Sequence, residues 1–378
     1  MIDRLILRNF KAFRSQDVSL APYCLLTGLN SSGKSSVLQA LALLRQSFER
    51  GALEFSGVSR SESGFLLNGD LVELGTGKDV LHEDYERHQS GPPVIELGME
   101  TGPDTRVSLW TAEYQPESDL LPLRDADGVA EGNPVFGSHF QYLRADRVAP
   151  AVSYPRSYDA AVRRRFLGAR GEHTVNFLRH HGDEFIHADT ALQHPQARSL
   201  RLADQTEAWM QEICPGVNLE AVGIEGTDQV RLSFKFGTAG LSSSNRYRPT
   251  NVGFGLTYAL PIVVACLTAR PGALILLENP EAHIHPRGQT AIARLTCAAA
   301  RAGAQVLVET HSDHILNGVR ITVKEQGLQP DQVALHFFNR TTDRTEIVTP
   351  VLGADGMLST WPEGFFDEWD RSLDQLLD

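Results

Sequence analysis

The chain has 378 residues, of which 42% are hydrophobic and 22% charged, which is the composition of a globular protein with a buried core. Its formal net charge of −12 argues against a surface that is basic throughout, as non-specific binding to nucleic acid would require. No apolar run approaches the roughly 20 residues of a membrane-spanning helix, and the N-terminus lacks the pattern of a signal peptide. We therefore expect a cytoplasmic protein with no membrane contact.

Two short strands are predicted in the first twenty residues, around Leu5–Leu7 and around Val18–Leu20. The apolar run Tyr23–Thr27 predicts a buried strand, and apolar residues at helical spacing predict a helix that opens near Gly33. Between this strand and this helix, residues 28–35 read Gly-Leu-Asn-Ser-Ser-Gly-Lys-Ser, which matches the phosphate-binding P-loop pattern at every required position.

A strand, a glycine-rich loop and a helix in this order are what binding a nucleoside triphosphate requires. The glycines let successive backbone N–H groups face one anion, and the helix N-terminus adds a partial positive charge. Lys34 is predicted to reach the β- and γ-phosphates of ATP, and Ser35 is predicted to hold Mg²⁺. The predicted nucleotide-binding residues of this segment are Asn30, Ser31, Ser32, Gly33, Lys34, Ser35 and Ser36.

The first fifty residues resemble the N-terminal lobe of the SMC/RecF-type ATPases, which belong to the ABC-type superfamily. The resemblance rests on the Asn9–Phe13 turn, which the P-loop follows within a few residues. In such relatives the next part of the chain completes an antiparallel sheet, and half-buried strands are predicted at Val94–Leu97 and Val107–Trp110. Residues 115–135 are rich in Pro, Asp, Glu and Gly, and they predict a surface loop.

The segment Phe140–Arg147 resembles one found in a subgroup of AAA ATPases that end in a small domain of unknown function. Arg144 and Arg147 are candidates for facing phosphate or a neighbouring subunit, and an ordinary ion pair beside Asp146 is the alternative. Residues 155–220 are predicted to be largely helical. Their basic cluster Arg163–Arg165 is either a face for nucleic acid or a partner, or a solvated face paired with acids.

A helix is predicted from about Thr257 to Leu267, and the glycine-containing segment before it suits an anion. This segment resembles the signature motif of ABC-type ATPases in a variant form, and a tight strand-to-helix turn is the alternative. In that family the signature of one subunit contacts the γ-phosphate on the P-loop of another. The resemblance therefore implies nucleotide contacts from Asn251, Gly253 and Gly255.

The buried strand Ala273–Glu278 ends in an acid, as a Walker B strand does, and Glu278 is predicted to accompany Mg²⁺. Asn279 follows, where the superfamily carries the carboxylate that polarises the attacking water. An amide orients water but cannot accept its proton, and a positioned general base contributes typically 10²–10⁴-fold. Turnover is therefore expected to be slow unless Glu281 replaces the missing base.

The next buried strand, Gln305–Glu309, is followed by Thr310 and His311. His311 resembles the switch histidine that senses γ-phosphate in ABC-type ATPases. A hairpin is predicted over residues 333–350, with its turn near 341–343, and the tail at 364–370 resembles the small C-terminal domain of the same subgroup. The predicted catalytic residues are Glu278, Asn279, Glu281 and His311.

Together these features predict an α/β fold, the head of an ABC-type P-loop NTPase with a mixed central sheet and an antiparallel N-terminal lobe. A helical insertion is expected, and coiled-coil arms are not, since no heptad repeat of useful length is present. The predicted boundaries are 1–150 for the N-terminal ATPase lobe, 151–220 for the insertion, 221–355 for the C-terminal ATPase lobe and 356–378 for a small tail.

The resemblance implies an ATPase that forms a homodimer or higher homo-oligomer around ATP and Mg²⁺ and drives a protein effector such as a separate nuclease. Its expected setting is anti-phage defence, where the ATPase component of Septu systems is similar, or DNA maintenance. One alternative is an ATP-bound switch with little hydrolysis. Another is a nuclease like the OLD relatives, which fuse this head to a Toprim domain. Only about thirty residues follow the hairpin here, and they show no paired acidic motif.

Overall fold

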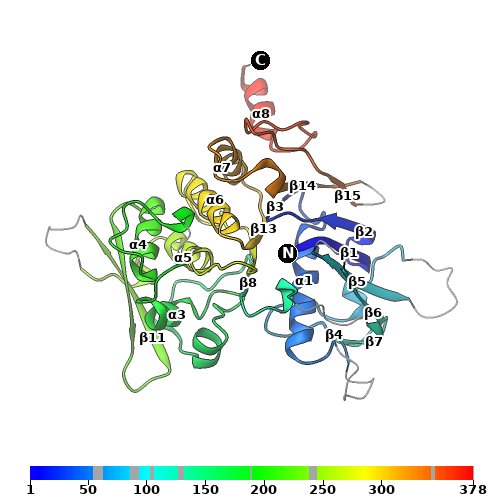
Figure 1. Cartoon of the computed structure of the whole chain (residues 1–378), viewed down its shortest axis with the longest axis horizontal. Helices are drawn as coiled ribbons and strands as arrows, with labels where there is room; N and C mark the ends of the chain where they lie inside the picture. Colours follow the sequence, from blue (N-terminus) through cyan, green and yellow to red (C-terminus); the bar gives the residue numbers. More distant parts are fainter. Residues whose placement is uncertain are drawn as a thin grey trace.

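A six-stranded sheet runs through the middle of the computed structural model and carries the P-loop strand (Figure 1). The structure describes residues 1–53, 63–85, 93–102, 106–126, 132–187, 190–237, 245–341 and 345–377. The strand order is β15-β14-β3-β13-β12-β8, and all neighbours are parallel except β14 and β15. The strand bounds are β3 Tyr23–Gly28, β8 Phe140–Leu143, β12 Leu274–Glu278, β13 Gln305–Glu309, β14 Val333–Arg340 and β15 Thr345–Val348.

Both faces of this sheet are covered, which explains why its strands are continuous apolar runs. Along β12, Leu274 and Leu276 pack on the face covered by α1 (Lys34–Glu49), whereas Ile275 and Leu277 pack on the opposite face. Three helices cover that opposite face: α5 Phe254–Leu267, α6 Pro286–Arg301 and α7 Asp313–Lys324. The strand order also places β13 between the P-loop strand and β12, which matters for the site.

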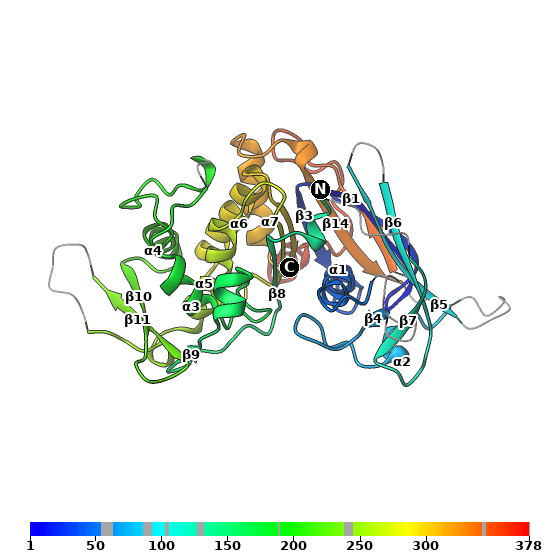
Figure 2. The same ribbon diagram turned by 60° about the horizontal axis from the view of Figure 1, so that its bottom comes forward.

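An antiparallel sheet packs on the other side of α1, in the order β2-β1-β5-β6-β7-β4 (Figure 2). Its strands are β1 Ile2–Phe10, β2 Phe13–Ser19, β4 Gly64–Leu66, β5 Val94–Thr101, β6 Arg106–Glu113 and β7 Leu120–Ala126, and the short helix α2 spans Gly77–Val80. β7 corrects the loop predicted over 115–135. Its Leu121 and Leu123 are buried in the core, while Pro122 between them and the charged Arg124 and Asp125 after them conceal the strand.

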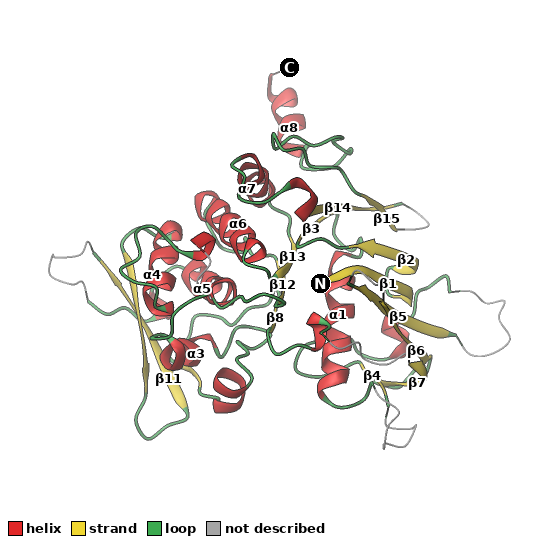
Figure 3. Ribbon diagram, viewed as in Figure 1, coloured by secondary structure: helices red, strands yellow, loops and turns green. Residues whose placement is uncertain are grey.

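The segment between β8 and β12 mixes helices and strands (Figure 3). Of residues 155–220, predicted to be largely helical, the elements between the strands Tyr154–Pro155 and Val217–Gly223 are indeed helical, but they are short and loops separate them. Gly168 and Gly171 adopt φ values of +86° and +75°, which interrupt a helix there. Besides α5, the helical pieces of this segment are a π-helical turn at Asp159–Arg163, α3 Thr174–His181, α4 Leu202–Ile213 and 3₁₀ turns at Thr190–Leu192 and Pro249–Asn251. A three-stranded sheet, ordered β10-β11-β9, consists of β9 Tyr154–Pro155, β10 Val217–Gly223 and β11 Gln229–Phe236.

The residues that follow β15 dock on the core, an outcome that the sequence leaves open. Phe365 is fully buried, and its ring centroid lies 5.3 Å from that of Phe337 on β14. Arg320 of α7 donates a 2.8 Å hydrogen bond to the carbonyl oxygen of Gly356. The chain then forms α8 (Glu368–Leu377), and shorter 3₁₀ turns lie at Pro134–Phe136 and Pro330–Gln332.

The predicted hairpin is β14 and β15, and residues 342–344 of its turn lie outside the described residues. None of the helices described is both long and apolar enough to cross a membrane.

Candidate nucleotide-binding site

The P-loop joins β3 to α1, and both of its glycines have backbone angles that other residues avoid. Gly28 has φ +130° and Gly33 has φ +103°. A Cβ atom on Gly33 would lie 2.8 Å from the ring of Phe13, and one on Gly28 would lie 2.1 Å from the carbonyl oxygen of Phe338. The positive φ angles and the lack of room for a Cβ atom therefore both require glycine at positions 28 and 33.

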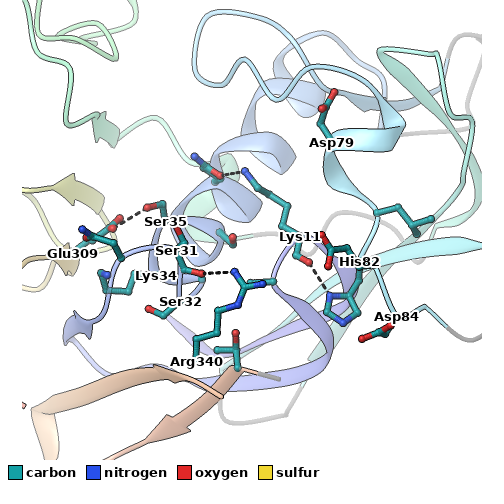
Figure 4. Close-up of a pocket in the computed structure, with 18 of the residues that line it drawn as sticks. Lys11, Ser31, Ser32, Lys34, Ser35, Asp79, His82, Asp84, Glu309 and Arg340 are labelled. Carbon is teal, nitrogen blue, oxygen red and sulfur yellow. Dashed lines mark hydrogen bonds between the residues drawn. The ribbon is translucent and has the colours of Figure 1, made fainter. Parts of the chain in front are cut away.

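A cavity of about 670 Å³ opens over the P-loop (Figure 4). This volume lies in the range typical of small-molecule sites. The lining of the cavity includes four cationic side chains, Lys11, Lys34, Lys78 and Arg340, and four acidic ones, Asp79, Glu83, Asp84 and Glu309. Lys34 belongs to the P-loop itself, where a cation suits an anionic ligand. Arg340 also donates to the carbonyl oxygen of Ser31, at 3.4 Å. All seven P-loop residues predicted to bind nucleotide line the cavity, and so do Asn279, Glu309 and His311 from the ends of β12 and β13.

Lys34 and Ser35 lie in the first turn of α1, at the floor of the cavity. The ammonium of Lys34 donates to the carbonyl oxygens of Gly28, at 3.0 Å, and Leu29, at 2.6 Å. Burial lowers the pKa of Lys34. Ser35 donates its hydroxyl to Oε1 of Glu309, at 2.8 Å.

Glu278 ends β12 as predicted, but its carboxylate is held by the β8 side of the sheet. Oε1 accepts a 2.5 Å hydrogen bond from the hydroxyl of Tyr142, and Oε2 accepts a 3.0 Å hydrogen bond from the amide of Ala145. Among the described residues, Glu278 does not line the cavity. Its predicted association with Mg²⁺ therefore stays a prediction, without a contact to Ser35 to support it.

Glu309 is a site residue that the sequence analysis does not assign. It lies at the end of β13, is 5% exposed and lines the cavity. Burial, reinforced by the neighbouring carboxylate of Glu278, raises its pKa to about 7. The signal in the sequence is an acid that ends a buried strand just before Thr310 and His311. The structure pairs that acid in register with Glu278 on β12.

Asn279, Glu281 and His311 lie on the loops that follow β12 and β13. Asn279 has φ +42°, a left-handed conformation in which asparagine is enriched. Glu281 accepts hydrogen bonds from the hydroxyl of Thr310, at 2.7 Å, and from the amide of His311, at 2.8 Å. It therefore holds the histidine loop, and the predicted general-base role remains a prediction. Partial desolvation at the cavity edge lowers the pKa of His311, which favours the neutral ring.

Arg147 lies beneath the loop after β12, and this position corrects its predicted role. It is 1% exposed and donates to the carbonyl oxygens of Glu278, at 2.8 Å, and Asn279, at 2.6 Å. Its guanidinium also lies 5.2 Å from the ring centroid of Tyr258 on α5. A side chain buried in this way faces neither phosphate nor a neighbouring subunit. Arg144 instead forms an ion pair with Asp146, at 2.9 Å, which is the predicted alternative.

The predicted signature segment opens α5, which begins at Phe254 rather than near Thr257. Asn251 and Gly253 are exposed, and within the described part of the chain they lie outside the lining of the P-loop cavity. A Cβ atom on Gly255 would lie 2.5 Å from the carbonyl oxygen of His283, so glycine allows α5 to pack against the loop after β12. Nucleotide contacts from this segment stay a prediction.

Each arginine of the cluster Arg163–Arg165 has an acidic partner. Asp159 pairs with Arg163 and, at 2.9 Å, with Arg164, while Glu184 pairs with Arg165 at 2.9 Å. The bond from Arg165 is the main reason that the pKa of Glu184 falls to about 2. The geometry favours the paired, solvated face over a free basic face for nucleic acid.

Comparison with protein-family models matches residues 25–317 to the family described as "AAA domain, putative AbiEii toxin, Type IV TA system". Residues 328–376 match a family of unknown function, DUF3696. No curated protein sequence matches the chain.

Two solved structures are similar over nearly the whole chain. One is an Smc head bound to the C-winged helix domain of ScpA, with 12% identity, coverage of 93% of this chain and 98% of that chain, and a TM-score of 0.50. The other is an Smc head domain with an extended coiled coil, bound to the C-terminal domain of ScpA and derived from Pyrococcus furiosus. It has 12% identity, coverage of 100% and 99%, and a TM-score of 0.51. At this identity the likeness shows the fold.

Proposed function

The chain belongs to this AAA domain family, and we propose that it is an ABC-type ATPase of the SMC/RecF-like group that binds ATP with Mg²⁺ in the P-loop cavity and hydrolyses it. The observation that carries the proposal is the convergence of a complete P-loop, Asn279 and His311 on one cavity. The Ser35 hydroxyl and a neighbouring carboxylate are oxygen donors, which Mg²⁺ prefers. Bound there, the ion would neutralise phosphate charge.

The assembly that we propose is a homodimer or higher homo-oligomer, in which the start of α5 of one copy meets the cavity of another. The support is that Asn251 and Gly253 are exposed and lie outside the described lining of their own cavity. A helix N-terminus offers free N–H groups to an anion. Bound ATP would stabilise such an assembly by mass action.

The partner that we propose is a protein effector such as a separate nuclease, in a cytoplasmic system of phage defence or DNA maintenance. The support comes from the relatives, since the matched family is described as a putative toxin of a toxin–antitoxin system and both similar Smc heads are bound to a domain of ScpA. A self-contained nuclease has less support. Nowhere in the described residues do three or more His, Cys, Asp or Glu side chains form a group that could hold a metal ion.

A second candidate, an ATP-bound switch with little hydrolysis, is favoured by Asn279 and by the two bonds that occupy Glu281. If Glu281 is nonetheless the general base, Glu281→Gln lowers the rate of turnover by roughly 10²-fold or more and accumulates an ATP-bound dimer. An unchanged rate in this variant removes Glu281 from the chemical step.

The proposed function is tested by ATP affinity, ATP turnover and molecular mass, each measured with and without ATP and Mg²⁺. Lys34→Ala should weaken ATP binding about 10- to 100-fold, from the roughly 1.5–3 kcal/mol of a charged hydrogen bond. Lys324→Ala, at the exposed end of α7, is the matched control and should leave affinity unchanged. Equal ATP affinity in wild type and Lys34→Ala would refute the site.

A further inference from the structure

Two carboxylates lie side by side at the ends of neighbouring parallel strands. Glu278 of β12 and Glu309 of β13 are register partners, and both lie on the sheet face that packs against α1, as shown by Leu276 and Leu307 two residues earlier. Because β13 lies between β12 and the P-loop strand, Glu309 is one strand closer to the P-loop than Glu278.

The two carboxylates have different partners. Both oxygens of Glu278 are engaged, by Tyr142 and by the amide of Ala145. Glu309 accepts one hydrogen bond, from Ser35, and its Oε2 is buried without a hydrogen-bond partner among the described residues. Figure 4 shows the Glu309 side chain directed at Ser35 on the cavity side.

A buried carboxylate oxygen without a partner calls for an explanation, because burial without a hydrogen bond is costly. A cation is a natural partner at this place, since the carboxylate already touches the P-loop serine hydroxyl. Carboxylate and hydroxyl oxygens are the donors that Mg²⁺ and Mn²⁺ prefer.

We propose that Glu309, together with Ser35, supplies the protein oxygens that receive the divalent cation accompanying ATP, and that Glu278 is a positioning residue. The metal-side carboxylate of this chain thus belongs to β13 and not to the Walker B strand. Glu278 and Tyr142 instead brace the end of β12. This inference rests on the proposed function, because it presupposes that nucleotide binds over the P-loop.

Glu309→Gln removes the charge of the side chain but keeps its shape and its acceptor for Ser35. The variant therefore separates a role of the charge in metal binding from a role that only holds Ser35 in place. Without a divalent cation, the acid repels the phosphates, so the variant should bind nucleotide at least as tightly as wild type. With a divalent cation, the acid attracts the ion, so the variant should bind more weakly. A residue that merely holds Ser35 in place would change both affinities in the same direction.

The experiment measures the Kd of the full-length protein for a fluorescent, non-hydrolysable ATP analogue, once in EDTA and once in Mn²⁺. Wild type should bind more tightly in Mn²⁺. Glu309→Gln should lose at least about 10- to 100-fold of that Mn²⁺ effect, because that is the loss already caused by removing a residue that only positions a metal ligand. Glu309→Asp, which retains the charge, should recover part of it, and exposed Glu325→Gln should behave as wild type.

Glu278→Gln decides between the two carboxylates, and it should retain more of the Mn²⁺ effect than Glu309→Gln. The inference would be overturned if Glu278→Gln lost more of the Mn²⁺ effect on nucleotide affinity than Glu309→Gln, or if Glu309→Gln kept the full effect of the wild type. Either result would leave the proposed function intact. Absence of nucleotide binding by wild type in both buffers would overturn the proposed function itself, and this inference with it.

Discussion

Charged side chains at the strand ends around the cavity differ in burial and in bonding partners from those in the segment between β8 and β12. Arg147 and Glu309 are buried there and Glu281 is half-buried, and their partners are backbone groups and hydroxyls. In the segment after β8, arginines such as Arg163 and Arg165 pair with acids at the surface. Removing a buried charge leaves its partners unsatisfied, whereas removing a surface charge returns them to water. Removal of one charged side chain is therefore expected to destabilise the protein more at these strand ends than in the segment after β8.

The largest effect is expected for Arg147→Met, which removes the buried donor of two carbonyl oxygens. We expect a loss of about 3 kcal/mol in the free energy of unfolding, from leaving these acceptors unsatisfied. Urea denaturation at pH 7 measures it. Arg144→Met is the matched control, because the Arg144 pair with Asp146 is partly exposed and should cost less than about 1 kcal/mol. Equal losses in the two variants would contradict the comparison.

A smaller effect is expected for Glu184→Gln, which breaks the pair with Arg165. The Glu184 side chain is 46% exposed, so solvent screening limits its contribution to about 1 kcal/mol. Because the folded protein lowers the pKa of Glu184 to about 2, this stability is present above pH 4.5 and is lost as pH falls toward 2. Unfolding free energies of wild type and variant should therefore differ at pH 7 and converge at low pH. A constant difference would show that packing and not charge is responsible.

The smallest effect is expected for Arg163→Ala, whose side chain is 73% exposed. The free energy of unfolding should change by less than about 0.5 kcal/mol.

Alanine at all three positions of the cluster Arg163–Arg165 also tests the nucleic-acid interpretation. If the arginines are only paired with acids, the salt dependence of any DNA binding should not change. A slope that falls by about 0.9 for each arginine removed would show phosphate contacts and reverse this conclusion.

The parts of the fold and site that the sequence predicts are those with a local signal. The P-loop, the apolar strand Ala273–Glu278 and His311 are each recognisable within about ten residues of chain, and the structure brings the P-loop and His311 to one cavity. β7 and β9 have no such signal, whereas β11 has one, because Val230, Leu232 and Phe234 alternate with polar residues as in a half-buried strand. β9 has two residues, and β7 contains Pro122 and two charged residues, so composition predicts loop where pairing makes strand.

The contact between Glu309 and Ser35 shows a different limit. The sequence shows Ser35 as a P-loop residue and Glu309 as the end of an apolar strand, but the two lie 274 positions apart. Which of two strand-ending acids reaches Ser35 depends on the order of strands in the sheet, and that order is decided by the packing of the whole chain. Arg147 is similar, because a charged residue in a polar segment carries no sign that it will be buried beneath a loop from β12.

One strand links the C-terminal segment to the P-loop. On β14, Phe337 contacts Phe365 of the docked segment on one face of the sheet, and Phe338 is the register partner of Gly28, at the start of the P-loop. An extended strand is stiff along its length, and consecutive side chains point to opposite faces. A protein that binds the C-terminal segment would therefore bind beside Phe337, and the following residue of that strand, Phe338, lies beside Gly28 of the P-loop. A force on the C-terminal segment would act on the same strand that helps to shape the phosphate-binding loop.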